Sequence, residues 1–309
     1  MRQTDFHHEA FFYADADEFL AGTVPFLRDG LEGGEPALVA VRQARSEALQ
    51  VELRSKGEQI RFVEMERLGR NPARIIPTWR RFVDEHGGSD HPIRGIGEPV
   101  WPRRSPAEID ECQRHESLLN YAFWDGPAWR LLCPYDSAVL DAGVLDAAHR
   151  SHSFVSGSAA SQAAGKALDP EAVAPFAGTL PSRPAGATTF DFNRATLHDA
   201  RALVATEAGR AGLSADRTFD LVASVGELTA NSILHGGGQG VLSVWHEDGA
   251  MLVEVEDRGR IEAPLTGRHR PTGSQIDGRG LWMVNQLCDL AQVRSGPDGT
   301  RVRARMDLA

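Results

Sequence analysis

The sequence has few cysteines and no long hydrophobic run. Its three cysteines, Cys112, Cys133 and Cys288, cannot all pair with one another and are too few for a disulfide scaffold. The apolar stretches are no longer than a strand, so no membrane-spanning helix is expected. The N-terminus lacks the basic start and apolar core of a signal peptide. Together these absences predict a protein of the reducing cytoplasm that does not bind a membrane.

Lysine is almost absent, and acidic residues outnumber basic ones. Lys56 and Lys166 are the only lysines, and 33 basic residues stand against 43 acidic ones, a net charge of −10. Nucleic-acid binding needs a basic surface, so this balance argues against direct contact with DNA or RNA. No Gly-x-x-x-x-Gly-Lys-Ser/Thr sequence occurs, which excludes a P-loop ATPase. The hydrophobic content of 41% is that of a folded protein.

A stretch of small, polar and proline residues divides the chain at residues 156–187. This stretch has few large apolar side chains and cannot offset its own ordering entropy by burial. We therefore predict a flexible linker between a domain of residues 1–155 and a domain of residues 188–309. The first domain alternates strand-like and helix-like segments, such as 36–41 and 72–85, which predicts a mostly parallel α/β sheet.

The second domain has a different order of elements. Two long helices are predicted at residues 194–211 and 216–235, ahead of antiparallel strands at 240–257 and 291–306. A loop rich in glycine, proline and arginine separates the two pairs of strands. Helices segregated from an antiparallel sheet predict an α+β layer.

The longer of these helices carries a carboxylate and an amide on one face. Glu227 and Asn231 are four residues apart, so their side chains project from the same side of the helix. Their oxygens suit Mg²⁺, which prefers oxygen ligands shared with phosphates and water. The carboxylate is also a suitable acceptor for the proton of an attacking hydroxyl group. Either residue alone is more often simply solvated.

Two further motifs lie downstream in the same domain. Asp257 ends a predicted strand shortly before Gly259. A carboxylate in this position can accept a hydrogen bond from the exocyclic amine of a base, and the glycine lets the flat base approach the backbone. Gly278 and Gly280 open a predicted helix, whose exposed N–H groups and dipole favour a phosphate. Each motif is weak alone, but all three in this order indicate a nucleotide site.

This order of motifs resembles the GHKL ATPases, and among them the anti-sigma-factor serine kinases of the RsbW type. The resemblance implies an α+β sandwich of the Bergerat type that binds ATP and Mg²⁺, with the loop 260–277 as the ATP lid. It implies that Glu227 is the general base, that Asn231 binds Mg²⁺ and that Asp257 binds the adenine amine. The implied ATP contacts also include Gly259, Gly278, Arg279, Gly280 and Thr300. Arg260 stands where a second glycine is usual in this motif.

The resemblance also implies protein partners, a sigma factor and a STAS-type anti-sigma-factor antagonist. The chain would phosphorylate the antagonist on serine or threonine, as an RsbA-like regulator of transcription in a stress response. Two alternatives stay open, a nonenzymatic ATP-dependent binding module and a sensor histidine kinase. His198 would be the phosphorylated histidine of the latter, but residues 194–227 are too short for both a dimerisation hairpin and the first ATPase helix. The oligomeric state is open, a homodimer included.

The first domain resembles the MEDS sensory domain over about residues 6–155. The stretches that carry the resemblance are His7-His8 before 11–13, then 34–41, 69–74, 94–99, 112–116 with Asn120, and 132–136. The resemblance implies a RecA-like α/β fold without its P-loop that binds a small molecule. Glu98 is the first candidate for that ligand, because open α/β sheets bind ligands at the carboxyl ends of their strands. The other candidates are His8, His115, Glu116 and Tyr135.

Cysteines and histidines in the first domain also suit a metal ion. Cys112, His115, Cys133, His149 and His152 are residue types that bind zinc. Only one pair has a spacing suited to a helix, and the others come from different predicted elements. We therefore favour packing roles for Cys112 and Cys133, since buried cysteines are commonly small apolar residues.

Overall fold

The computed structural model describes residues 6–87, 91–157, 162–163, 174–271 and 278–308. The chain divides into two compact units, an N-terminal unit of residues 1–173 and a C-terminal unit of residues 174–309. No helix in the described ranges combines the length and the hydrophobicity needed to cross a bilayer.

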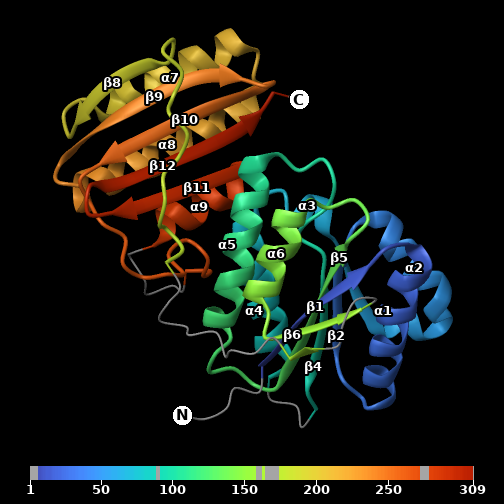
Figure 1. The fold of residues 1–309 in the computed structure, drawn as a ribbon. Helices are drawn as coiled ribbons and strands as arrows, with labels where there is room; N and C mark the ends of the chain where they lie inside the picture. Colours follow the sequence, from blue (N-terminus) through green and yellow to red (C-terminus); the bar gives the residue numbers. More distant parts are fainter. Residues whose placement is uncertain (1–5, 88–90, 158–161, 164–173, 272–277, 309) are drawn as a thin grey trace. The chain divides into compact units, whose positions relative to one another are not determined.

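The N-terminal unit is built on a seven-stranded sheet in the order β3-β2-β4-β5-β1-β6-β7 (Figure 1). Strands β1 to β6 are parallel, and β7 pairs antiparallel with β6. The strands are β1 (Phe6–Tyr13), β2 (Ala37–Val41), β3 (Ile60–Glu64), β4 (Ile93–Gly97), β5 (Trp129–Asp136), β6 (Phe154–Gly157) and β7 (Gln162–Ala163). The helices are α1 (Ala16–Glu32), α2 (Gln43–Leu53), α3 (Met65–Leu68), α4 (Ile75–His86), α5 (Pro106–Ala122) and α6 (Ala142–Ser151), with 3₁₀ turns at Arg54–Gln59 and Pro72–Arg74. The predicted α/β class is confirmed.

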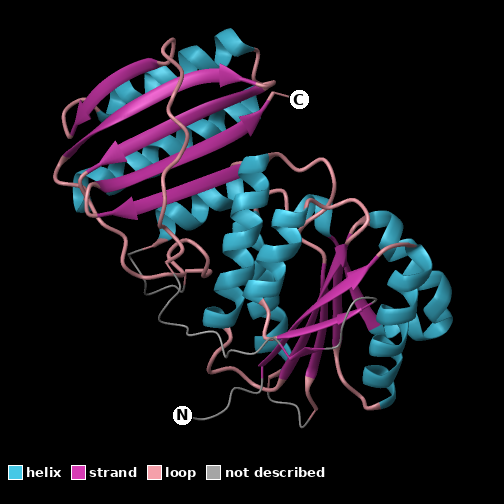
Figure 2. Ribbon diagram, viewed as in Figure 1, coloured by secondary structure: helices cyan, strands magenta, loops and turns pink. Residues whose placement is uncertain are grey.

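Helices cover both faces of this sheet, with α1 and α2 on one side and α4, α5 and α6 on the other (Figure 2). Strand β2 is consequently buried at every position, as expected for a parallel strand covered on both sides. Helix α5 begins at a capping box in which Ser105 Oγ accepts a hydrogen bond from the Glu108 backbone and the Glu108 carboxylate accepts one from the Ser105 backbone. This cap fixes the start of the helix that carries Glu116.

The register of β1 on β5 decides which side chains share a face. Ala10 lies opposite Cys133, and strand alternation places His8 and Tyr135 on the same face as this pair. The intervening residues, such as Phe11, face the core that packs against α1. One face of these two strands therefore carries His8, Cys133 and Tyr135 together.

The C-terminal unit has a five-stranded antiparallel sheet in the order β11-β12-β10-β9-β8. Helices pack on one face of it (Figure 2). The strands are β8 (Thr188–Asn193), β9 (Gln239–Glu247), β10 (Ala250–Asp257), β11 (Leu290–Gly296) and β12 (Gly299–Asp307), and the helices are α7 (Leu197–Ala211), α8 (Ala215–His235) and α9 (Arg279–Leu287). Met251, Val253 and Val255 point from β10 into the core beneath the helices. The predicted α+β layer is confirmed.

The end of the predicted linker packs onto the C-terminal unit. Residues 174–187 cross the sheet on the face opposite the helices (Figure 1). Phe176 and Leu180 are only 8% and 5% exposed, and Phe176 joins the unit's hydrophobic core. The backbone oxygens of Phe176 and Pro181 accept hydrogen bonds from Ser295 N (2.9 Å) and from an Arg303 side-chain nitrogen (2.6 Å). Two apolar side chains and two backbone hydrogen bonds therefore anchor residues 174–187, although their composition predicted a linker. The rest of the predicted linker includes residues 158–161 and 164–173, which lie outside the described ranges.

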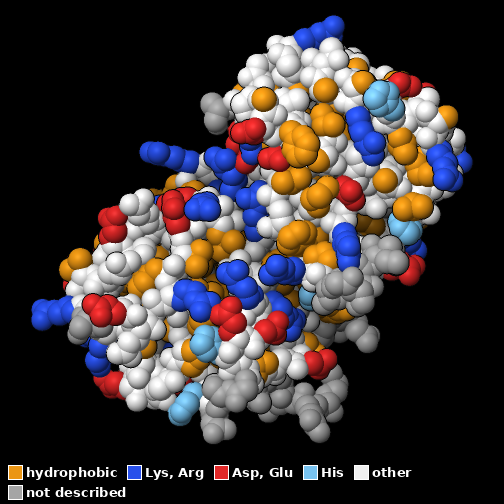
Figure 3. Space-filling model, turned by 180° about the vertical axis from the view of Figure 1, so that it is seen from behind, with side chains coloured by type: hydrophobic (Ala, Val, Ile, Leu, Met, Phe, Trp, Pro, Cys, Tyr) orange, Lys and Arg blue, Asp and Glu red, His pale blue; other side chains and the backbone are white. Residues whose placement is uncertain are grey.

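Some apolar side chains of this unit are exposed. Phe219 and Leu234 of α8 are 74% and 73% exposed. On the face of the molecule drawn in Figure 3, hydrophobic side chains are visible among acidic and basic ones. The exposure of Phe219 makes it a suitable control for the buried Phe176.

Changing Phe176 to alanine should destabilise the C-terminal unit by about 3 kcal/mol, because a buried aromatic side chain is lost and a cavity remains. Calorimetric unfolding of the full chain should show a lower melting temperature for that unit. Phe219→Ala should change its stability by less than about 0.5 kcal/mol. Equal melting temperatures for Phe176→Ala and the parent chain would show that this segment does not belong to the unit.

Candidate functional site

The face of α8 that carries Glu227 and Asn231 meets the start of α9. A Cβ atom placed on Gly280 would lie 2.7 Å from Glu227 Oε2 and 3.0 Å from Asn231 Nδ2. Glycine at this position therefore lets α9 approach both side chains. Gly278 caps α9 with φ +82°, a left-handed conformation that favours glycine, and the space beside its Cα is open. The first and third sequence motifs thus lie against one another.

Asp257 is held at the end of β10 by two hydrogen bonds. Ser232 Oγ donates to Asp257 Oδ2 (2.5 Å), and the Gly259 backbone N–H donates to Oδ1 (2.7 Å). Thr300 pairs with Asp257 across β10 and β12, and its hydroxyl donates to Gly259 O (2.8 Å). Since Ser232 follows Asn231 on α8, one helix contacts both the Gly280 and the Asp257 regions.

Two glycines allow the end of α8 to approach the end of β10. A Cβ atom on Gly236, which follows α8, would lie 2.5 Å from Asp257 Cγ. One on Gly259 would lie 2.7 Å from His235 O. Larger residues at either position would push the helix away from the strand and break the geometry at Asp257.

In the N-terminal unit, Glu98 lies directly after β4 and is buried. It accepts hydrogen bonds from the Tyr13 hydroxyl (3.3 Å), the Arg42 backbone (3.2 Å) and an Arg42 side-chain nitrogen (3.1 Å). Burial raises the pKa of the Glu98 carboxyl, although Arg42 lies against it. This polar group lies at the carboxyl ends of β1, β2 and β4.

The other N-terminal candidates lie elsewhere in the same unit. His8 Nε2 is 3.1 Å from Glu116 Oε2, and both residues are buried. The ring of Tyr135 packs edge-on against His152, with 5.6 Å between ring centroids. Burial lowers the pKa of His8 to about 4, with the neighbouring His152 acting in the same direction. His115 is buried on α5 but is not part of this group, so the five candidates do not form one site.

The sequence of each unit matches the model of a known domain family. Residues 7–153 match MEDS, described as the methanogen/methylotroph, DcmR sensory domain. Residues 190–306 match the histidine kinase-like ATPase domain. The chain carries a MEDS domain and a histidine kinase-like ATPase domain. Both resemblances found in the sequence are confirmed at the level of these domains.

One similar solved structure is the crystal structure of the RsbU and RsbW domains of Rv1364c from Mycobacterium tuberculosis. It shares 19% sequence identity with a TM-score of 0.31, over 39% of this chain and 32% of that chain. The match thus spans about a third of that chain's length. No curated protein matches this sequence.

A cavity of about 510 Å³ opens beside Asp257 in the ATPase domain. It is lined by Asp257, Thr300 and Arg260, by the turn between β11 and β12, and by residues 177–180. Glu227 and Asn231 do not line it. The cavity therefore adjoins only the end of the site at which adenine recognition is predicted, and it includes the Arg260 that departs from the motif.

The first half of the predicted lid is anchored to the ATPase core. Ile261 N donates to Ser295 Oγ (2.8 Å), and Asn285 Nδ2 donates to Gly267 O (2.9 Å). Gly267 has φ +76° and approaches α9 closely. Arg279, the first residue of α9, is exposed, and residues 272–277 of the lid lie outside the described ranges.

Several structural residues of this site were not selected from the sequence. Ser232 orients Asp257, Gly236 allows the approach of α8, and Ser295 hydrogen-bonds both Thr300 (2.7 Å) and the start of the lid. A serine directly after Asn231 and a glycine at the helix end are local signals for the first two. Ser295 has no such signal, because its role depends on the pairing of β11 with β12.

Gly280→Ala should lower the affinity of the ATPase domain for ATP with Mg²⁺ about tenfold, a loss of about 1.4 kcal/mol. The added methyl group would displace Glu227 and Asn231, which lie 2.7 and 3.0 Å from its position. Calorimetric titration of the full chain measures the change. Gly209→Ala on α7 is the matched control, since a Cβ atom there meets nothing within 4 Å. Equal affinities in both variants would contradict a nucleotide site at the α8–α9 contact.

Proposed function

We propose that the chain is a signal-responsive regulator whose ATPase domain binds ATP with Mg²⁺ and phosphorylates a protein on serine or threonine. The observation that carries this proposal is the contact of Glu227 and Asn231 with Gly280 at the start of α9. It brings a carboxylate and an amide beside a helix N-terminus, which favours phosphate. The match of residues 190–306 to the histidine kinase-like ATPase domain supports the same assignment.

In this proposal, the two side chains of α8 have different tasks. The Asn231 amide oxygen would bind Mg²⁺, which neutralises phosphate charge when bound. Glu227 would accept the proton of the incoming serine or threonine hydroxyl. Its carboxylate is half-buried and directed at the start of α9, so it would meet a hydroxyl group placed beside the terminal phosphate.

The remaining site residues would hold the two ends of the nucleotide. Asp257, with Ser232 and Gly259 fixing its carboxylate, would accept a hydrogen bond from the adenine amine, and Thr300 would lie beside the base. Gly278, Arg279 and Gly280 would lie along the phosphates. Arg279 is the first residue of α9 and is exposed, and a guanidinium group suits a phosphate.

The proposed partners follow from the resemblance of the motifs to anti-sigma-factor serine kinases. The chain would bind a sigma factor and phosphorylate a STAS-type anti-sigma-factor antagonist. The MEDS domain would receive a small-molecule signal, for which Glu98 and its neighbours at the strand ends are the candidates.

The position of α7 argues against a histidine kinase. Ala200, Val204 and Ala208 of α7 are buried in the core that also contains α8. This helix is therefore the first helix of the ATPase domain and is not available as a dimerisation helix. His198 lies exposed in its first turn.

ATP with Mg²⁺ should stabilise the ATPase domain, because a ligand that binds only the folded state shifts unfolding by mass action. At a hundredfold excess over Kd the gain is about 2.7 kcal/mol. Calorimetry of the full chain should show a higher melting temperature for the ATPase domain. Asp257→Asn should abolish the shift. A folded chain whose melting does not respond to millimolar nucleotide would contradict ATP binding.

Glu227→Gln should reduce phosphoryl transfer by roughly 10²–10⁴, the usual contribution of a general base. Nucleotide affinity should change little, because the amide keeps the size of the carboxylate and the proposed task concerns only the hydroxyl group. The measurements are ATP titration and transfer to the cognate antagonist, with acid stability distinguishing phosphoserine from phosphohistidine.

Asn231→Ala is the companion variant and should lower both ATP affinity and transfer. Transfer by Glu227→Gln at the parental rate would refute the general-base assignment. A parent chain that binds ATP but phosphorylates no partner would favour the nonenzymatic binding module.

A further inference from the structure

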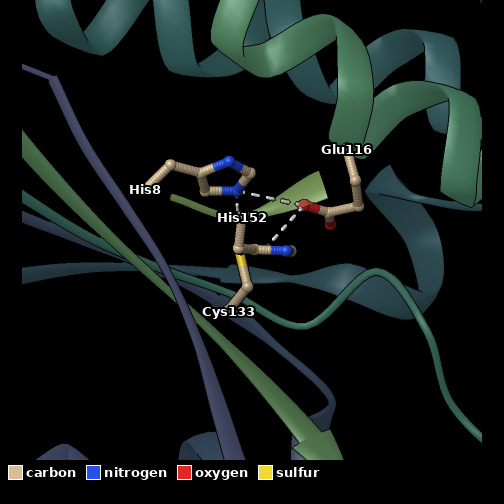
Figure 4. Close-up of side chains that lie close together, drawn as sticks. All are labelled: His8, Glu116, Cys133 and His152. Carbon is tan, nitrogen blue, oxygen red and sulfur yellow. Dashed lines mark hydrogen bonds and ion pairs between the residues drawn. The ribbon is translucent and has the colours of Figure 1, made fainter. Parts of the chain in front are cut away.

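Four side chains with metal-binding atoms converge inside the MEDS domain (Figure 4). His8 comes from β1, Glu116 from α5 and Cys133 from β5, and His152 follows α6 directly. Each is no more than 2% exposed, and their donor atoms all lie within 4.8 Å of one another. We propose that these four residues form a site for a divalent transition metal, with zinc as the best match.

The distances between the donor atoms suit a tetrahedral ion. His8 Nε2 lies 3.1 Å from Glu116 Oε2 and 3.4 Å from Cys133 Sγ, and His152 Nε2 lies 3.3 Å from the same Glu116 oxygen. Bonds of about 2.0–2.3 Å around tetrahedral zinc place neighbouring ligand atoms about 3.3–3.8 Å apart. Small shifts of the side chains would therefore complete the coordination.

Hydrogen bonds outside the cluster turn both imidazole rings toward its centre. His152 Nδ1 lies 2.8 Å from the Ala148 backbone oxygen, and His8 Nδ1 lies 3.1 Å from Asn120 Oδ1. The Asn120 amide is oriented by its Nδ2 donating to Ser151 O (2.8 Å). Both Nδ1 atoms must therefore donate, which leaves the Nε2 lone pairs of the neutral rings facing Glu116. Such outer contacts are the usual way in which a protein orients histidine ligands.

Without a cation, this arrangement is electrostatically unfavourable. Two imidazole lone pairs would face a carboxylate oxygen, which also only accepts hydrogen bonds. Protonating one ring would leave the other lone pair facing the carboxylate, and protonating both would bury two positive charges against one negative charge. Within the described residues, Glu116 Oε1 has no hydrogen-bond partner, and His152 Nε2 lies 3.3 Å from Glu116 Oε2 without the geometry of a hydrogen bond. A divalent ion with one carboxylate, one thiolate and two neutral imidazoles gives a net charge of zero.

The donor set also indicates which metal the site takes. A thiolate and two imidazoles disfavour Mg²⁺ and Ca²⁺, which prefer oxygen, and suit Zn²⁺. Four protein ligands without an open position are typical of a structural site. The ion would tie the two central strands β1 and β5 to α5 and to the segment that enters β6. This site is separate from the Glu98 group proposed for the small molecule.

The test is a titration of the full chain, treated with chelator, with Co²⁺ as the probe. One equivalent should produce the strong visible absorption of tetrahedral cobalt and a thiolate-to-cobalt charge-transfer band in the near ultraviolet. Stoichiometric Zn²⁺ should abolish both. Folded chain that shows neither signal would overturn the proposal.

Variants assign the ligands. Cys133→Ser should remove the charge-transfer band, and His152→Gln should lower metal affinity at least tenfold. The matched control is Cys112→Ser, whose thiol is buried in the same domain but donates to Pro99 O outside the cluster, and it should retain the parental spectrum. Circular dichroism verifies folding in each case.

A positioning variant keeps the proposal testable if a ligand variant does not fold. Asn120→Ala removes the acceptor for His8 Nδ1 and should weaken metal binding about 10–100-fold, with the visible bands keeping their shape. Unchanged affinity in Asn120→Ala, or a charge-transfer band that persists in folded Cys133→Ser, would refute the assigned ligand set.

Discussion

The close approach of α8 to the end of β10 is the constraint on which the ATPase site depends. Glycine at 236 and 259 removes the side chains that would keep helix and strand apart, and the Ser232–Asp257 hydrogen bond holds them together. Since α8 also carries Glu227 and Asn231, its position sets the distance between the proposed adenine and phosphate ends of the site. A rigid helix of 21 residues is well suited to hold that distance constant.

Sequence reasoning was most successful where a motif lies within one element or between neighbouring ones. The spacing of Glu227 and Asn231 placed them on one helix face, and the alternation of strands and helices predicted both fold classes. These inferences need only local periodicity. They did not extend to Gly236 or Ser295, because the roles of these residues depend on which strand and helix ends meet in space.

The proposed metal cluster depends even more on contacts between elements that are far apart in the sequence. Cys133 was expected to be a buried packing residue, and burial is what the structure shows. Its position next to His8 follows from the register of β1 on β5, two strands separated by more than a hundred residues of sequence. The sequence drew attention to Cys133 and His152, which belong to the cluster, but equally to Cys112, His115 and His149, which lie outside it, and a helical spacing rule could not have found His8.

The segment that enters the ATPase domain is connected to the same hydrogen-bond network that fixes Asp257. Phe176 O accepts from Ser295 N, and Ser295 Oγ contacts both Thr300 Oγ1 (2.7 Å) and Ile261 N (2.8 Å), at the start of the lid. Thr300 in turn donates to Gly259 O. Because Phe176 O accepts from the backbone N–H of this same Ser295, residues 174–180 cannot leave the edge of β11 without removing the acceptor of that N–H. The backbone that follows the predicted linker is thus part of the structure that holds the end of the site near Asp257.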